Sequence, residues 1–285
     1  MSEINNLAYF LNSIKKTLPF ENTEDFKKKI DESKDFRIRV QKLVYLSKFF
    51  GWDNSYHFNF HENGPYSCQL SEDYHSIDSF DNLNNNIELD KNFNEFIYNK
   101  NQEFLEASST ILYYLNKVNL KKISKNKLTA ILKYLKPHIP KNIIEKSYDA
   151  IYKYKLQIHD FSNHEIKLKK EIVFDKIYGL MNIFKNFELC SNQTLILGSL
   201  DYSRLALKRE NLKKHEKNEL LRRIYDYSDY IEKYYFNNYS LSKNFTYCDL
   251  RQIDEKFDEL QNYIADLGIL PRLYDEDVDL NIFCE

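Results

Sequence analysis

The sequence predicts a mainly α-helical protein built in two parts. It contains only five glycines and five prolines among 285 residues, well below the usual share of these two residue types. Sandwiches and barrels need many tight turns, and a nucleotide-binding sheet needs a glycine-rich loop, so the scarcity of glycine argues against these folds. Apolar residues make up 42% of the chain and aromatic residues 15%, which suits a folded core rather than a disordered chain.

The best-defined predicted unit is a helix, a short strand, a turn and a second helix. Apolar side chains recur at helical spacing through residues 37–51, where a glycine ends the pattern. Aromatic and polar residues alternate through residues 56–61, which is the period of a strand. Asn-Gly-Pro at 63–65 then predicts a turn, and Ser67 is placed to cap a helix that reaches Tyr74. The strand suits one half of a wing, so the first part is a candidate winged-helix-like unit.

Residues 78–101 are rich in Asn and Asp and predict a loose connector. Apolar periodicity resumes after it, and Pro137 and Pro140 mark the end of one helix and the start of the next. The pattern predicts helices over residues 104–115, 128–135 and 140–158.

The polar stretch at residues 159–165 is the predicted boundary between parts 1–158 and 159–285. The second part predicts a helical bundle that ends in an acidic tail. Residues 250–267 carry apolar side chains at alternating steps of three and four, a spacing that packs against a neighbouring helix or against a partner protein. The predicted helices of this part cover residues 172–184, 214–236 and 250–267, the last two as a hairpin.

Charge, cysteines and motifs exclude several classes. The 41 basic and 43 acidic residues give a net charge of −2, so no global field draws the chain to nucleic acid. The four cysteines lie far apart, which predicts reduced thiols in a cytoplasmic protein. Neither a secretion signal nor an 18-residue apolar run is present, so no membrane partner is expected. Hydrolase, NTPase and dinucleotide motifs are missing, and no cofactor is predicted.

His57 and His61 are the residues that most invite a metal site. On a strand they share a face but lie about 13 Å apart at about 3.3 Å per residue. Zinc ligands must approach one ion to about 2.0–2.3 Å, so this pair cannot chelate it and no metal is predicted.

Two stretches, RVQKLVYLSKFFGW at 39–52 and YHFNFHENGPYSCQLSEDY at 56–74, resemble the YwgA-like family and more distantly the Panacea (SocA-like) domain. The shared elements are a Q-K-L-x-Y-L helix, an aromatic strand, a G-P-Y-S turn and a short helix with an acidic–aromatic end. Residues 104–115 and 135–140 also resemble that family, so the resemblance covers about residues 4–158. The YwgA-like family has no assigned function, whereas the likeness to the Panacea domain implies an α-rich antitoxin or adaptor module that neutralises a protein partner, often beside phage or mobile elements, without established catalytic residues.

The leading hypothesis is therefore a non-catalytic protein-interaction module, of antitoxin, adaptor or regulator type, in a defence or mobile-element system. Tyrosine suits interfaces because it offers contact area together with a hydrogen bond. An alternative for the G-P-Y-S motif is purely structural, with Tyr66 packed on Tyr45. The residue pattern of 250–267 also permits a homo-oligomer. The predicted partner-binding residues are Gln41, Tyr45, Tyr66, Ser67, Tyr227, Tyr230 and Tyr234.

Two alternatives involve nucleic acid. Lys213, Lys214 and Lys217 belong to a basic run that suits either a solvated helix surface or the phosphate contacts of a winged-helix-like DNA-binding regulator. Arg209 and His215 match the R-x4-6-H spacing of the HEPN ribonucleases, which they resemble. In that family the two side chains act on the 2′-hydroxyl and the phosphate, although in one regular helix this spacing places them on different faces.

Overall fold

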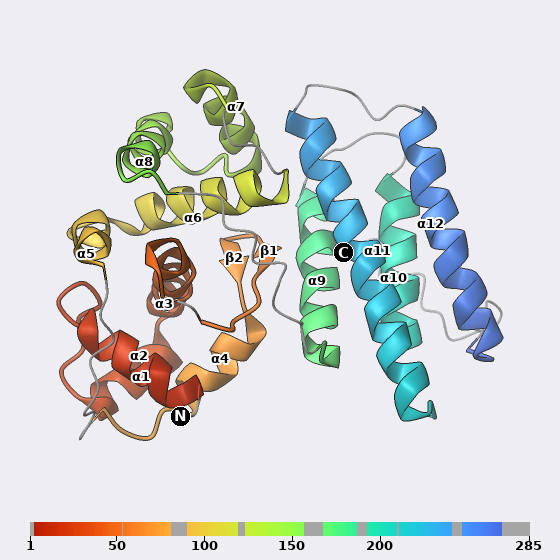
Figure 1. Cartoon of the computed structure of the whole chain (residues 1–285), viewed down its shortest axis with the longest axis horizontal. Helices are drawn as coiled ribbons and strands as arrows, with labels where there is room; N and C mark the ends of the chain where they lie inside the picture. The colour runs from red at the N-terminus through yellow and green to blue at the C-terminus, as the bar shows by residue number, and fades with distance from the viewer. Residues whose placement is uncertain are drawn as a thin grey trace.

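The computed structural model confirms a mainly α-helical protein. The described residues form twelve α-helices, one 3-10 helix and one two-stranded sheet. Figure 1 shows α1–α8 gathered around a β-hairpin and α9–α12 standing side by side next to them. The predicted boundary at 159–165 lies outside the described residues. The structure describes residues 3–52, 54–80, 90–118, 123–156, 168–186, 193–209, 211–240 and 247–269.

The helices predicted in the first part are confirmed, and a further one lies where a connector was predicted. This helix, α5 (Lys91–Ile97), buries Phe93 and Phe96 in the core, so the connector prediction for residues 78–101 was wrong over Lys91–Ile97. The elements of the first part are α1 (Glu3–Ser13), α2 (Thr23–Glu32), α3 (Lys34–Ser47), the 3-10 helix η1 (Lys48–Phe50), β1 (Asn59–His61), β2 (Gly64–Tyr66), α4 (Cys68–His75), α5 (Lys91–Ile97), α6 (Gln102–Lys117), α7 (Lys125–Leu135) and α8 (Lys141–Lys153).

Local capping explains where the key helices begin and end. Oγ of Ser33 accepts a hydrogen bond from the amide of Phe36 at the start of α3, and Oγ of Ser67 does the same for the amide of Leu70 in α4. Gly51 adopts a φ of 87° directly after η1, which confirms its predicted role as the stop signal. Helix α8 ends at Lys153, earlier than the predicted 158.

The hairpin is shorter and differently placed than predicted. Residues Asn59–His61 of β1 pair antiparallel with Gly64–Tyr66 of β2, so the predicted Asn-Gly-Pro turn is partly a strand. Gly64 has a φ of 85°, and a Cβ at this position would lie 2.8 Å from Oγ1 of Thr110. Glycine is therefore required there both by backbone conformation and by the close approach of α6.

The hairpin lies inside the molecule, between α3 and α6 on one side and α9 (Lys170–Asn186) on the other. Tyr56, Phe58 and Phe60, the aromatic positions of the predicted alternation, are all buried. A wing that reads DNA projects into solvent, so this hairpin does not have the position that the winged-helix-like alternative requires.

The second part forms the predicted helical bundle, with α11 and α12 as the predicted hairpin. Ile253, Leu260 and Ile264 of the predicted seam are buried within the chain, and Phe257 packs on Tyr202 and Tyr227. The described residues of the seam are thus covered by neighbouring helices of the same chain. The bundle contains α9, α10 (Gln193–Leu207), α11 (Lys214–Ser240) and α12 (Tyr247–Asp266).

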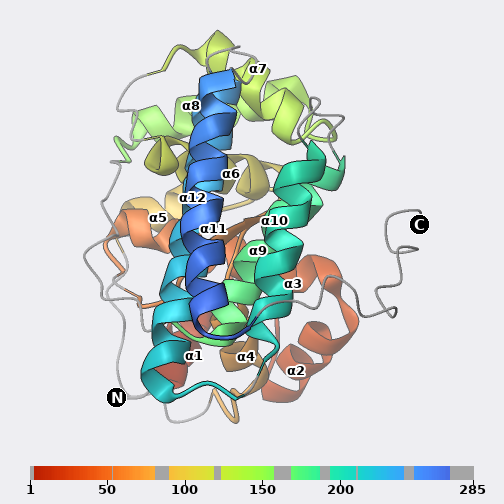
Figure 2. The same ribbon diagram turned by 90° about the vertical axis from the view of Figure 1, so that its right-hand side faces the viewer.

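One continuous apolar core joins the two parts. Helix α9 packs directly on β1, and a Cβ added at Gly179 would overlap the carbonyl oxygen of Phe60. Figure 2 shows α12 and α10 on the side of the bundle that faces away from the first part. Among the described helices, none combines the length and the apolar character that a bilayer crossing requires.

Candidate functional site: a surface at the junction of the two parts

The motif that resembles the YwgA-like family is held together from inside the fold. The side-chain amide of Gln41 donates to the carbonyl of Ser67 and accepts from its amide, both at 3.0 Å. Gln41 and Ser67 are each 1% exposed. These two predicted partner-binding residues therefore fix α3 to the start of α4, and their side chains offer no surface to a partner.

Tyr45 is a core residue as well. Its ring packs edge-on against Phe49 and Phe58, with centroids 5.4 and 5.0 Å away, and burial raises the pKa of its hydroxyl well above the ordinary value. Tyr66 is half-buried, and its ring lies 4.9 Å from that of His61 instead of on Tyr45. Of the four motif residues, Tyr66 alone thus reaches the surface.

Two buried lysines support the hairpin from behind. Nζ of Lys42 donates to the carbonyl of Pro65 at 2.6 Å, and Nζ of Lys136 donates to the carbonyl of His61 at 3.2 Å. Burial lowers the pKa of Lys42 to about 7 and that of Lys136 to about 8, with Glu106 opposing the decrease in both. The lysines therefore hold both strands, although no sequence pattern pointed to them.

Helix α9 holds the hairpin from the opposite side. Nδ2 of Asn59 donates to the carbonyl of Ile172 at 3.3 Å and to Oδ2 of Asp175 at 3.1 Å. Nε2 of His61 lies 2.9 Å from Oδ1 of the same aspartate, a distance that suits an ion pair when the imidazole is protonated. Asp175 therefore joins both ends of β1 to the bundle.

From this contact a line of partly exposed side chains runs outward over α9 and α10. Phe174 and Tyr178 stack with centroids 6.3 Å apart, and the guanidinium of Arg204 lies 6.0 Å from the centre of the Tyr178 ring. Asp201 holds Arg204 at 2.7 Å, and Tyr178 is 44% exposed. We call this set the junction surface: His61, Tyr66, Phe174, Asp175, Tyr178 and Arg204.

A buried network of charged side chains connects α9 of the junction surface to two neighbouring helices. Nζ of Lys176 lies 2.8 Å from Oε2 of Glu232 and 2.9 Å from Oδ1 of Asp229, and Lys117 of α6 contacts the same two carboxylates. Burial alone would raise the pKa of Glu232, but Lys117 and Lys176 outweigh burial and lower it to about 2. The hydroxyl of Tyr113 donates to Glu232 at 2.8 Å. The network therefore ties α6, α9 and α11 together.

Two titratable groups beside the hairpin, Cys68 and His57, have pKa values shifted away from the range that nucleophilic catalysis needs at neutral pH. Burial, with Asp175 adding to it, raises the pKa of Cys68 to about 12, so its thiol stays protonated at neutral pH. Burial and the nearby lysines lower the pKa of His57 to about 3, and its Nε2 lies 2.6 Å from the hydroxyl of Tyr225. Within the described residues, no group of three or more His, Cys, Asp or Glu side chains is arranged to bind a metal ion.

The three predicted tyrosines of α11 lie away from the motif. Tyr227 is buried and donates to Oγ of Ser199 at 2.7 Å, so it belongs to the bundle core. Tyr230 and Tyr234 are half-buried and stack with centroids 5.9 Å apart, and Tyr230 donates to Oε1 of Gln252 at 2.8 Å. The side chains of Tyr230 and Tyr234 are therefore partly exposed on the α11–α12 hairpin.

The remaining predicted residues gather where α10 is followed by α11. Arg209 lies just beyond α10 and His215 in the first turn of α11, so the two do not share one helix, and both are exposed. Lys213, Lys214 and Lys217 are exposed in the same region. The spacing that resembled the HEPN ribonucleases therefore spans a helix–helix connection whose two named side chains lie in solvent.

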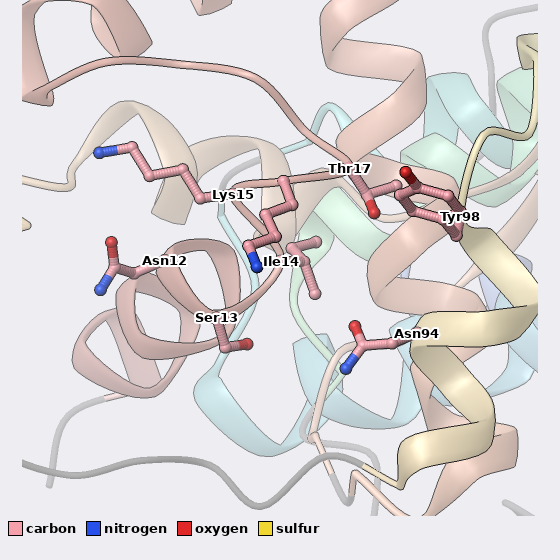
Figure 3. A pocket seen from close by; sticks show the side chains of 8 residues that line it. Asn12, Ser13, Ile14, Lys15, Thr17, Asn94 and Tyr98 are labelled. Atoms are coloured by element: carbon pink, nitrogen blue, oxygen red, sulfur yellow. The ribbon is translucent and has the colours of Figure 1, made fainter.

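A hollow of about 620 Å³ lies between the end of α1 and the end of α5 (Figure 3). Tyr98, which is 59% exposed, forms one wall, and Lys15 on another side donates to the carbonyl of Glu21. The lining residues are Asn12, Ser13, Ile14, Lys15, Lys16, Thr17, Asn94 and Tyr98, without a carboxylate, histidine or cysteine. The hollow has no acid–base pair, and the junction surface remains the better candidate site.

Comparison of the chain with protein-family models, with curated proteins and with solved structures gives no match. The geometry of the junction surface is therefore the basis on which a function can be proposed.

Proposed function

We propose that this protein is a cytoplasmic protein-interaction module, of adaptor or neutralising antitoxin type, which binds its protein partner through the junction surface. The observation that carries the proposal is the pairing of the exposed Tyr178 ring with Arg204 and its stacking on Phe174. Aromatic residues and arginine are enriched among the side chains that dominate binding energy at protein interfaces.

The support beneath this surface favours binding. Asp175 ties α9 to the hairpin, and Lys176 ties α9 to α11, so the helix that presents Phe174 and Tyr178 is fixed on two sides. Binding to a surface that is already rigid costs less conformational entropy than binding that must first order the surface. Tyr178 also brings contact area with few rotatable bonds.

A tagged purification of the full chain from the cells in which it occurs, with nuclease present, tests the proposal. We expect a near-stoichiometric protein partner with the wild type and its loss in Tyr178→Ala and Arg204→Ala, because truncation of a central contact costs about 2 kcal/mol or more, roughly a 30-fold weaker complex. The matched control is Tyr152→Ala, since Tyr152 is 39% exposed and stacks on Tyr148 of α8, away from the junction.

Retention of the partner by Tyr178→Ala, or equal loss in Tyr152→Ala, would remove the junction surface as the binding site. Recovery of the wild type with no protein partner would contradict the interaction module itself.

A further inference from the structure

A second surface lies where α10 is followed by α11, at the lower end of the bundle in Figure 2. Five cationic side chains are exposed there, two after the end of α10 and three at the start of α11. We call them the basic cluster: Lys208, Arg209, Lys213, Lys214 and Lys217.

The charges of the basic cluster are not neutralised by the described side chains around them. None of the five lies within ion-pair distance of a described carboxylate, whereas the nearby Arg222 is bound to Glu219 at 2.6 Å and to Asp226 at 2.8 Å. Glu216, inside the cluster, uses its carboxylate to accept the amide of Lys213 at 2.8 Å, which caps α11. Glu210 lies outside the described residues. The cluster therefore presents exposed positive charge at the N-terminus of a long helix, whose dipole adds to it.

The surroundings of the cluster favour a polyanion over a protein. The apolar residue between the cationic positions, Leu212, is half-buried and packs on the core, and the exposed side chain of Leu205 lies one turn before Lys208, at the edge of the cluster. Protein interfaces depend on buried aromatic and apolar anchors, whereas phosphate contacts need only exposed cations and amide groups. Since charges more than about 10 Å apart are screened at 0.1 M salt, the acidic residues elsewhere on the chain do not cancel this local field.

We propose that the basic cluster binds the phosphate backbone of nucleic acid without reading its sequence. This binding is separate from the junction surface and does not need the hairpin to act as a wing. Binding of this kind releases counterions, so its affinity falls steeply as salt rises.

Fluorescence anisotropy of the full chain with labelled single-stranded RNA, single-stranded DNA and duplex DNA of about 20 nucleotides tests the proposal. We expect binding at 50 mM NaCl that weakens at least tenfold by 200 mM. The triple variant Lys213→Glu/Lys214→Glu/Lys217→Glu is expected to bind at least tenfold more weakly than the wild type at 50 mM and to reduce the salt slope by about two to three.

A matched triple variant at Lys27, Lys28 and Lys34, which are exposed on α2 and α3, makes the same change in net charge and is expected to stay within twofold of the wild type. Equal loss in both triple variants, no binding by the wild type, or tighter binding of poly-glutamate than of the oligonucleotides at equal charge would overturn the proposal. Tyr178→Ala is expected to bind the oligonucleotides as the wild type does, so failure of the junction surface and failure of the basic cluster are separable. Circular dichroism confirms that each variant is folded.

Discussion

At the scale of single residues, the buried lysines show how polar side chains organise this fold. Lys42 and Lys136 are each 1% exposed, yet each donates to a carbonyl of the hairpin. A buried ammonium is costly unless it is paired, and each of these two gains a carbonyl while Lys136 also lies 3.3 Å from Glu106. The hairpin is therefore placed by specific polar contacts as well as by apolar packing.

The lowered pKa of Lys42 predicts a pH-dependent stability. Its pKa is about 7 in the fold and 10.5 for a free lysine, so between these values the unfolded chain binds one more proton than the folded chain. Stability contributed by this group must therefore rise with pH across that window, by up to about 1.4 kcal/mol per pH unit. Urea unfolding of wild type and Lys42→Met at pH 7 and pH 8.5 checks this.

We expect the free energy of unfolding to increase more with pH in the wild type than in Lys42→Met. The comparison cancels the titrating groups that do not interact with Lys42, including Cys68, whose raised pKa acts in the opposite direction above the ordinary thiol pKa of 9.0. Equal pH dependence in the two proteins would show that Lys42 keeps its proton in the fold.

At the scale of elements, α9 determines the site. Asn59, Asp175 and Gly179 bring α9 against β1, and this approach places Asp175 beside His61. A helix at this position needs a glycine where its backbone meets the strand. The bundle also contains a glycine in open surroundings, Gly198 of α10, which serves as its control.

Gly179→Ala is expected to destabilise the protein by about 2 kcal/mol or more, because the new methyl group collides with the Phe60 carbonyl and must move α9 or β1. Gly198→Ala is expected to stabilise it by about 0.5–1 kcal/mol, since alanine is the better helix former and meets no neighbour there. Thermal or urea unfolding measures both. Similar effects of the two substitutions would mean that α9 does not approach β1 as closely as described.

The elements themselves were largely predictable, and their arrangement was not. Helical spacing predicted α3, α6, α7, α9, α11 and α12, and Ser67 was correctly placed as the cap of α4. Helices α1, α2 and α10 were not predicted, α5 was missed because its apolar residues stand within an Asn-rich stretch, and α8 proved shorter than its pattern. Short apolar patterns lack the length that makes helical periodicity clear.

The site was predictable only in part, because its residues come from distant positions in the sequence. Tyr66 was identified from its motif, but Asp175, Tyr178 and Arg204 lie more than 100 positions further along the chain. The apolar stripe of α9 accounts for its buried face, and Phe174, Asp175 and Tyr178 occupy the remaining face at helical spacing. The polar and aromatic pattern of that second face was visible in the sequence. Its role depends on the contact of α9 with the hairpin, and no local pattern specifies that contact.

At the scale of the whole molecule, the two sequence parts behave as one structure. The apolar core is continuous, and the network of Lys117, Lys176 and Glu232 joins α6 of the first part to α9 and α11 of the second. The junction surface exists only when both parts are folded and in contact, because its residues come from β1, β2, α9 and α10. Its proposed binding function is thus a property of the complete fold.

Equilibrium urea unfolding followed by two probes tests this central claim most directly. Trp52, the sole tryptophan, stacks on Phe10 in the first part and reports its unfolding by fluorescence, while far-ultraviolet circular dichroism reports the helices of both parts. We predict coincident transitions, and a common shift to lower urea in Lys176→Met, because that change leaves Glu232 short of a buried partner. Two separate transitions, or a shift confined to the dichroism signal, would show that the parts fold independently and that the junction surface is not a fixed site.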